Sequence, residues 1–267
     1  MSWLNLENKV AIVTGGSSGI GLAVVNELLS DGVRVVVADL NSPSEETILS
    51  NRENMLFIRT DVTSSQSVEV LVSETVKHWG TVDILVNNAG INIPCLLVDE
   101  GHRYELNEAV WDKVMNINLK GVFFCAQVCG RVMVKNKSGV IINMSSESGI
   151  EGSEGQSVYA ATKNAVNSLT RSWAKELGKK GIRVVGVAPG IMEATGLRTI
   201  TYETALAYTR GITVEKLRAG YSSTSTTPMG RSGKLTEVAT TVAFLASEKA
   251  SYIHGVTLNV AGGKTRG

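Results

Sequence analysis

The segment SVYAATKNAV, which begins at Ser157, places a tyrosine and a lysine four residues apart among helix-forming residues. Side chains at this spacing lie on one face of a helix, so Tyr159 and Lys163 can direct a hydroxyl and an ammonium into the same volume. A tyrosine, with an ordinary pKa of about 10, accepts a proton at neutral pH only where nearby positive charge stabilises its phenolate. Such pairs also occur on ordinary helix surfaces, so a catalytic role requires further residues elsewhere in the chain.

A glycine-rich segment, TGGSSGIG, begins at Thr14 and directly follows a short β-branched run. Glycines let the backbone turn sharply and approach a pyrophosphate, and the helix that follows offers its free amides and positive dipole end. The spacing differs from the common G-x-G-x-x-G fingerprint, and a plain strand-to-helix turn would also explain it. The segment predicts a dinucleotide-binding turn formed by Gly15, Ser17, Ser18, Gly19, Ile20 and Gly21.

An acidic residue ends the next β-branched run, VVVADL. Asp39 lies about 20 residues beyond the glycine turn, where a carboxylate hydrogen-bonds the adenosine ribose of a dinucleotide. The same carboxylate repels a 2′-phosphate, and neither Leu40 nor Asn41 supplies a basic side chain to bind one. The pattern predicts NAD rather than NADP as the cofactor.

Strands and helices must alternate to position these residues. Seven short β-branched segments are typical of strands buried on both faces, namely residues 10–14, 33–40, 55–60, 82–87, 139–145, 182–188 and 256–263. Longer amphipathic segments lie between them, among them residues 20–32, 67–80, 121–136 and 165–181. The alternation predicts one doubly wound α/β domain over residues 1–267, with a parallel sheet that binds ligands beyond the carboxyl ends of its strands.

Composition excludes several classes of function. The 267 residues carry 26 Lys and Arg against 25 Asp and Glu, so no global field attracts nucleic acid or an anionic membrane. No segment has the pattern of a signal peptide, and the cysteines Cys95, Cys125 and Cys129 indicate reduced core thiols in a cytoplasmic protein. Two thiols without a nearby histidine make a poor zinc site, so we expect no metal.

The chain as a whole resembles the short-chain dehydrogenase/reductase family. The motifs of that family occur in order over nearly the full length: TGGSSGIG at Thr14, DV at Asp61, NNAG at Asn87, NLKG at Asn118, NMSS ending at Ser146, YAATK at Tyr159 and PG at Pro189. The resemblance implies a Rossmann-type sheet with strand order 3-2-1-4-5-6-7.

The resemblance also implies a catalytic role for four residues. Tyr159 is expected to be the acid/base, Lys163 its partner and a contact of the nicotinamide ribose, Ser146 the residue that orients substrate, and Asn118 the holder of a water in a proton relay. Ser146 is preferred over Ser145 because its distance in sequence from Tyr159 matches the family spacing.

Further cofactor contacts follow from the same resemblance. Asp61 and Val62 are expected beside the adenine, and the NNAG motif supports the central strand. The set expected to contact the cofactor beyond the glycine turn and Asp39 is Asp61, Val62, Asn88, Ala89, Gly90, Tyr159, Lys163, Pro189 and Gly190.

A long segment after PG, about residues 191–232, is expected to form a helical substrate lid over the active site and is called the lid here. Within the family, segments around Ser146 and in the lid resemble bacterial dehydrogenases of phosphorylated polyols, which implies oxidation of sorbitol 6-phosphate to fructose 6-phosphate with formation of NADH. The residues expected to contact such a substrate are Ser146, Glu147, Tyr159, Arg198, Arg210 and Lys264, with a lid arginine or Lys264 on the phosphate. Three alternatives stay open: another polyol or sugar dehydrogenase, a 3-oxoacyl thioester reductase, and a module that binds NAD without turnover.

The segment GVFFCAQVCGRVMV, which begins at Gly121, is apolar over more of a helix circumference than one sheet covers. We expect part of this helix to pack against a second copy of the chain, in a homodimer or homotetramer of the kind that the family forms.

Overall fold

The computed structural model describes residues 3–49 and 51–264. Seven parallel strands form one sheet in the order β3-β2-β1-β4-β5-β6-β7, which confirms the predicted fold. The strands are β1 Val10–Thr14, β2 Arg34–Asp39, β3 Met55–Arg59, β4 Ile84–Asn87, β5 Gly139–Met144, β6 Ile182–Pro189 and β7 Thr257–Val260. The helices are α1 Gly19–Ser30, α2 Ser65–Trp79, α3 Glu108–Met115, α4 Gly121–Asn136, α5 Ser148–Glu151, α6 Ser157–Leu177, α7 Ile200–Thr209, α8 Val214–Gly220 and α9 Leu235–Ala246.

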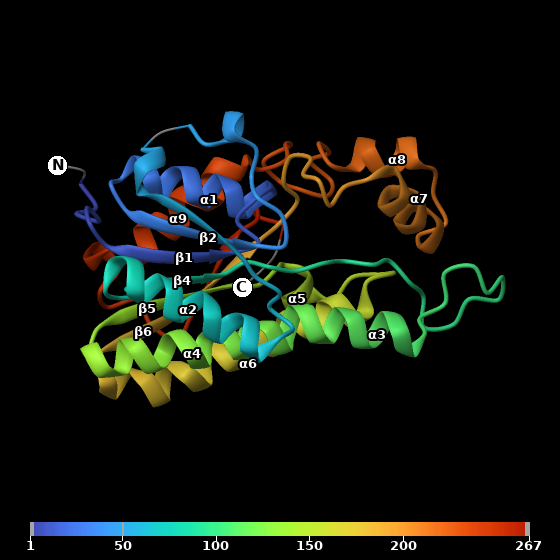
Figure 1. Ribbon diagram of the computed structural model, residues 1–267. Coiled ribbons are helices and arrows are strands. Elements are labelled where there is room, and N and C mark those ends of the chain that lie inside the picture. The colour runs from blue at the N-terminus through green and yellow to red at the C-terminus, as the bar shows by residue number, and fades with distance from the viewer. Residues whose placement is uncertain (1–2, 50, 265–267) are drawn as a thin grey trace.

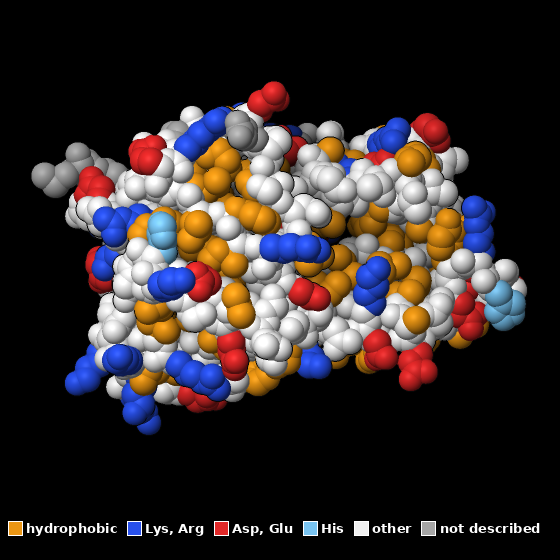
Figure 2. Space-filling model, in the orientation of Figure 1, with side chains coloured by type: hydrophobic (Ala, Val, Ile, Leu, Met, Phe, Trp, Pro, Cys, Tyr) orange, Lys and Arg blue, Asp and Glu red, His pale blue; other side chains and the backbone are white. Residues whose placement is uncertain are grey.

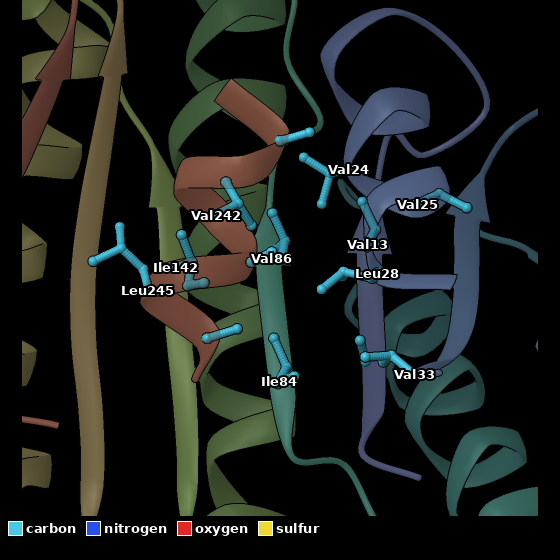
Figure 3. Close-up of a cluster of buried hydrophobic side chains, with 14 of the residues drawn as sticks. Val13, Val24, Val25, Leu28, Val33, Ile84, Val86, Ile142, Val242 and Leu245 are labelled. Atoms are coloured by element: carbon cyan, nitrogen blue, oxygen red, sulfur yellow. The ribbon is translucent and has the colours of Figure 1, made fainter. Parts of the chain in front are cut away.

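Helices cover both faces of the sheet (Figure 1). Helices α1 and α9 lie side by side on one face, and α2, α4 and α6 lie on the other. Figure 3 shows valine and leucine side chains of α1 and α9 directed at those of β1, β4 and β5. Each face of the sheet therefore has its own hydrophobic core, and the sheet lies between the two cores.

Successive residues of the central strand serve these two cores in turn. Ile12 packs under α2 and α4, whereas its neighbours Ala11 and Val13 pack under α1 and α9. All three side chains are fully buried. Side chains alternate between the faces of a strand, so a strand that is covered on both faces is apolar at every position.

A π-helical turn over Asn116–Lys120 joins α3 to α4. The resulting helical run, Glu108–Asn136, has the length and apolar composition of a membrane span. Core helices of soluble proteins meet the same criterion, and α4 packs against α2, β4 and β5. Its cysteines Cys125 and Cys129 are buried and unpaired, and burial raises the pKa of Cys125 to about 12.

The lid contains two helices, α7 and α8, in agreement with the helical lid that the sequence predicted (Figure 1). They share a small core of Leu206, Ala207 and Leu217. On its outer side α7 is held to the loop before α3, because the Tyr208 hydroxyl donates to Asp99 Oδ1 at 2.9 Å. The lid is thus a folded unit attached to the body at a defined contact.

Candidate active site

A cleft of about 1300 Å³ lies between the carboxyl ends of the strands and the lid. Figure 2 shows this hollow beneath the α7–α8 region, with hydrophobic side chains around it. Of the residues predicted to contact cofactor or substrate, all line the cleft except Ser17 and Gly21, which lie in the glycine turn behind it. The fold therefore brings together residues that are up to 249 positions apart in sequence, from Gly15 to Lys264.

The glycine turn between β1 and α1 has no room for a side chain at Gly15 or Gly21. A Cβ atom on Gly21 would lie 2.0 Å from the Gly15 carbonyl oxygen and 2.5 Å from Asn88 Nδ2. Gly15 and Gly19 have φ values of 63° and 56°, in the left-handed region that favours glycine. The bare backbone at the start of α1 fits a pyrophosphate, which makes the turn a suitable cradle for a dinucleotide.

The turn is held against the end of β4 by Thr14 and Asn88. Thr14 Oγ1 accepts hydrogen bonds from the backbone amides of Asn88 and Ala89, both at 3.0 Å. Asn88 Nδ2 donates in return to the carbonyl oxygens of Thr14 and Gly15, both at 3.0 Å. The NNAG motif therefore fixes the shape of the glycine turn as well as lining the cleft beside it.

Asp39 stands at the end of β2 beside the glycine turn. Its Oδ2 accepts from the Ser17 amide at 3.1 Å, and its Oδ1 accepts from the Asn41 amide at 3.4 Å. A carboxylate held by two backbone amides stays in place to meet a ribose. Leu40, beside it, is exposed on the cleft wall and carries no charge.

The remaining predicted cofactor residues frame the cleft on either side of the glycine turn. Asp61 caps its own loop by accepting from the Thr63 amide and hydroxyl, at 2.9 and 2.7 Å. Val62 is buried, and a Cβ on Gly121 would come within 2.8 Å of its Cγ2, so Val62 is wedged against the start of α4. Pro189 and Gly190 line the cleft where β6 leads into the lid.

Tyr159 meets Ser146 inside the cleft. Burial raises the pKa of Tyr159. The hydrogen bond from Ser146 lowers this pKa, and the negative charge of Glu147 raises it further. Ser145, the neighbouring alternative, donates instead to the Lys163 carbonyl oxygen at 3.1 Å. Both serines line the cleft just after β5, and of the two only Ser146 forms a hydrogen bond with Tyr159.

Lys163 is buried one helical turn from Tyr159. Its Nζ lies 5.7 Å from the centre of the Tyr159 ring and donates to the Met144 carbonyl oxygen at 2.8 Å. Burial lowers the pKa of Lys163 to about 8. Burial thus disfavours the charged form of both side chains, and the lowering of the Tyr159 pKa by nearby positive charge stays a prediction.

Asn118 is fully buried in the π-helical turn before α4. Its Oδ1 accepts from the Ile91 amide and its Nδ2 donates to the Ile91 carbonyl, both at 2.8 Å. The side chain thus pins the loop that continues the NNAG motif along the cleft. π-Helical turns are frequent at functional sites, and the water-holding role of Asn118 stays a prediction.

The predicted phosphate-binding residues have different surroundings. Lys264 forms an ion pair with Glu147, with 2.5 Å between Nζ and Oε1. Arg198 stacks 3.9 Å above the Tyr221 ring and donates to the Met192 carbonyl oxygen. Arg210 donates to Ser153 Oγ at 3.2 Å. Among the ion pairs of residues 3–49 and 51–264, neither arginine has a carboxylate partner.

Three polar residues in the cleft, Asn92, Gln156 and Tyr202, were not predicted from the sequence. The Tyr202 hydroxyl accepts from Gln156 Nε2 at 2.7 Å and from Asn92 Nδ2 at 3.4 Å. Gln156 stands one turn before Tyr159, a position that could have drawn attention to it. Tyr202 comes from the lid helix α7, where no sequence pattern marks one residue as facing the cleft.

Comparison with known proteins agrees with this geometry. The family model for short chain dehydrogenase matches residues 9–206. The sorbitol-6-phosphate 2-dehydrogenase of Klebsiella pneumoniae is 59% identical over 269 residues, which cover 100% of this chain and 99% of the relative. The 3-oxoacyl-[acyl-carrier-protein] reductase of Thermotoga maritima is 36% identical, over 97% of this chain and 99% of the relative. The crystal structure of gox2181 superimposes with a TM-score of 0.81 at 37% identity, over 97% of this chain and 96% of that one.

The family match spans most of the chain, and the curated relatives match nearly end to end. This chain therefore belongs to the short-chain dehydrogenase family, as its motifs predicted.

Proposed function

We propose that this oxidoreductase uses NAD to oxidise a secondary alcohol of a phosphorylated sugar alcohol, with sorbitol 6-phosphate giving fructose 6-phosphate as the reaction. One observation carries the chemical part of the proposal: Tyr159, Ser146 and Lys163 meet in a cleft that also contains the glycine cradle. The 59% identity to a relative named sorbitol-6-phosphate 2-dehydrogenase supports the substrate.

In the reaction, the hydroxyl group of the substrate loses a proton and the carbon that carries it loses a hydride. Ser146 and Tyr159 hydrogen-bond the hydroxyl that is oxidised, and Tyr159 Oη takes its proton. A bound nicotinamide would supply the hydride acceptor for the carbon that carries this hydroxyl. The C–H and O–H bonds break as the C=O bond forms, so the substrate loses two electrons and two hydrogens.

The proton transfer needs a positive charge beside Tyr159. Burial raises the pKa of Tyr159, and an unpaired tyrosine would remain protonated at neutral pH. We infer that Tyr159 loses its proton while Lys163 carries its ammonium charge nearby, since an opposite charge within about 4 to 6 Å lowers a pKa by about 1 to 3 units.

We infer NAD rather than NADP from Asp39. Its carboxylate is held at the rim of the cradle by the Ser17 amide, and residues 15–19 and 38–41 contain no lysine or arginine. A 2′-phosphate placed there would meet a negative charge without a cation to offset it.

A panel of substrates tests the proposal. NADH formation is measured with sorbitol 6-phosphate, sorbitol and other polyols, and NADPH or NADH consumption is measured with a 3-oxoacyl thioester. We expect the highest kcat/KM with sorbitol 6-phosphate and NAD. A higher kcat/KM for the thioester with NADPH would replace the proposal by the reductase alternative, and binding of NAD without turnover of any compound would favour the sensor alternative.

We also propose that the chain works in the cytoplasm as a homo-oligomer. Three large apolar side chains are exposed on the helices of one face: Val70 of α2, Trp111 of α3 and Phe123 of α4. Phe123 is 41% exposed in the helix whose apolar circumference predicted a second copy of the chain.

A further inference from the structure

A chain of hydrogen bonds connects the lid with the start of α6. Arg210 Nη2 donates to Ser153 Oγ at 3.2 Å, and Ser153 Oγ donates to Gln156 Oε1 at 2.7 Å. Gln156 Nε2 then donates to the Tyr202 hydroxyl oxygen at 2.7 Å. All four side chains line the cleft, and Gln156 stands one helical turn before Tyr159.

The chemistry of arginine gives this chain a direction. A guanidinium can only donate, so Ser153 Oγ accepts from Arg210 and its single proton goes to the Gln156 carbonyl oxygen. The amide group of Gln156 is then directed at Tyr202. Hydrogen bonds in a row polarise one another, which strengthens Tyr202 as a donor.

The proton of the Tyr202 hydroxyl has no acceptor among the residues that the structure describes. Among the hydrogen bonds of the described residues, this hydroxyl accepts from Gln156 and Asn92 and donates to none. Burial raises the pKa of Tyr202 to about 12, and the nearby Tyr159 also raises it, so the proton is retained at any working pH. A committed donor therefore faces the cleft close to the acid/base residue.

We propose that Tyr202 is a specificity-determining residue whose O–H donates to a hydroxyl oxygen on a carbon next to the one that is oxidised. Gln156 is the positioning residue that keeps this proton directed into the cleft. The inference rests on the proposed oxidation of a polyol, because a polyol carries hydroxyls on neighbouring carbons and a simple secondary alcohol does not.

The first test compares two substrates in Tyr202→Phe. This variant removes one oxygen and keeps the ring, so kcat/KM for sorbitol 6-phosphate should fall about tenfold, the value of one lost hydrogen bond. The kcat/KM for 2-butanol, which has no neighbouring hydroxyl, should change less than about twofold by the same reasoning. An equal loss on both substrates would contradict the proposal.

A matched control comes from the same helix. Tyr208 also carries its hydroxyl on α7, but donates to Asp99 outside the cleft. Tyr208→Phe should therefore leave the ratio of the two kcat/KM values at the wild-type level. A changed ratio in this control would show that lid attachment, rather than the Tyr202 hydroxyl, decides the preference.

The second test reverses the direction of the chain with Gln156→Glu. A carboxylate only accepts, so Glu at this position takes the protons of both Ser153 and Tyr202 and withdraws the donor from the cleft. The ratio of kcat/KM values should fall as in Tyr202→Phe, with no further fall in the double variant. A wild-type ratio in Gln156→Glu would mean that the amide has the opposite orientation and would overturn the inference.

The polyol in these tests is the best one in the substrate panel. If sorbitol 6-phosphate is not oxidised but another polyol is, the proposed substrate fails and the Tyr202 inference is still tested on that polyol. NAD affinity, measured by calorimetry, should be unchanged in every variant, because none of the altered residues belongs to the glycine cradle.

Discussion

At the scale of single residues, burial disfavours the charged forms of both members of the proposed catalytic pair, Tyr159 and Lys163. It lowers the pKa of the Lys163 ammonium and raises that of the Tyr159 hydroxyl, so each side chain favours its neutral form. The chemistry that we propose needs the charged forms of both. The charged forms that the proposed reaction needs therefore lower the stability of the folded protein at these two positions.

Tyr159→Phe should abolish turnover while NAD binding is retained. The substitution removes one oxygen that exchanges a proton in the reaction, whereas the cradle around Gly15 is untouched. Loss of general acid/base catalysis costs about 100-fold or more in kcat. Steady-state kinetics and calorimetric titration with NAD check both parts, and a variant that keeps most of its activity would overturn the mechanism.

Lys163→Met should stabilise the protein at neutral pH and inactivate it. The folded pKa of about 8 lies below the ordinary value of 10.5, so the folded state binds fewer protons than the unfolded state between these values. Stability of the native chain should thus rise with pH through this window, and the ammonium costs about 3 kcal/mol at pH 7.

Denaturant unfolding of both proteins at several pH values measures this effect. The lost hydrogen bond to Met144 offsets part of the gain, so we expect the variant to be about 1 to 3 kcal/mol more stable at pH 7. The difference should shrink as the pH approaches 10. A variant that is less stable at pH 7 would contradict the assigned direction of the pKa shift.

Asp39→Ala should raise the Michaelis constant for NAD and narrow the preference over NADP. The change removes ribose hydrogen bonds together with the charge that repels a 2′-phosphate. Kinetics with both cofactors measure the effect. Efficient use of NADP by the unaltered chain would already show that the cofactor assignment is wrong.

At the scale of elements, two devices define the cleft: the tight junction of β1 with α1, and the folded lid. The junction depends on the absence of side chains at Gly21, where a Cβ would overlap the Gly15 carbonyl. The lid depends on its own small core and on the contact between Tyr208 and Asp99. The junction thus leaves space by lacking a side chain, whereas the lid supplies side chains that line the cleft.

Gly21→Ala should weaken NAD binding at least about tenfold, since the turn must open to admit the new methyl group and the start of α1 shifts with it. Gly130→Ala in α4 is the matched control, because a Cβ there meets no atom within 4 Å. In the control we expect unchanged NAD affinity and a stability gain of up to about 1 kcal/mol. Equal NAD affinity in Gly21→Ala and the native chain would show that the glycine turn does not bind the cofactor.

Arg198→Ala should lower the preference for sorbitol 6-phosphate over sorbitol about tenfold. One charge-assisted hydrogen bond to a phosphate contributes about 1.5 to 3 kcal/mol, and Arg198 lines the cleft without a carboxylate partner among the described residues. Arg231→Ala is the control, because Arg231 pairs with Glu237 outside the cleft. If Arg198→Ala keeps the preference for sorbitol 6-phosphate, Arg210 becomes the candidate that binds the phosphate. Equal kcat/KM values of the native chain on sorbitol 6-phosphate and sorbitol would exclude a phosphate site.

At the scale of the whole molecule, the exposed apolar residues of α2, α3 and α4 predict self-association. Phe123→Lys should shift the sedimentation coefficient toward that of a monomer, because a charge cannot be buried unpaired in an apolar interface. Phe123 lies away from the cleft, so the monomeric variant should still bind NAD. A native chain that sediments only as a monomer at micromolar concentration would refute the expected assembly.

The sequence by itself determined the sheet and the glycine turn, and it predicted the members of the catalytic set. Strands buried on both faces need apolar residues at every position, and a backbone that approaches a phosphate needs glycine, so both features are written in local residue types. The helix 121–136 was predicted with its observed bounds for the same reason, since its period is local.

Only the tertiary structure decided which side chains share the cleft and what their surroundings do to them. Lys264 is paired with Glu147, 117 positions away, and Tyr202 of the lid meets Gln156 of α6. The opposing pKa shifts of Tyr159 and Lys163 arise from burial under several elements at once. Desolvation and long-range hydrogen bonds depend on contacts between distant segments, and no spacing within one segment encodes them.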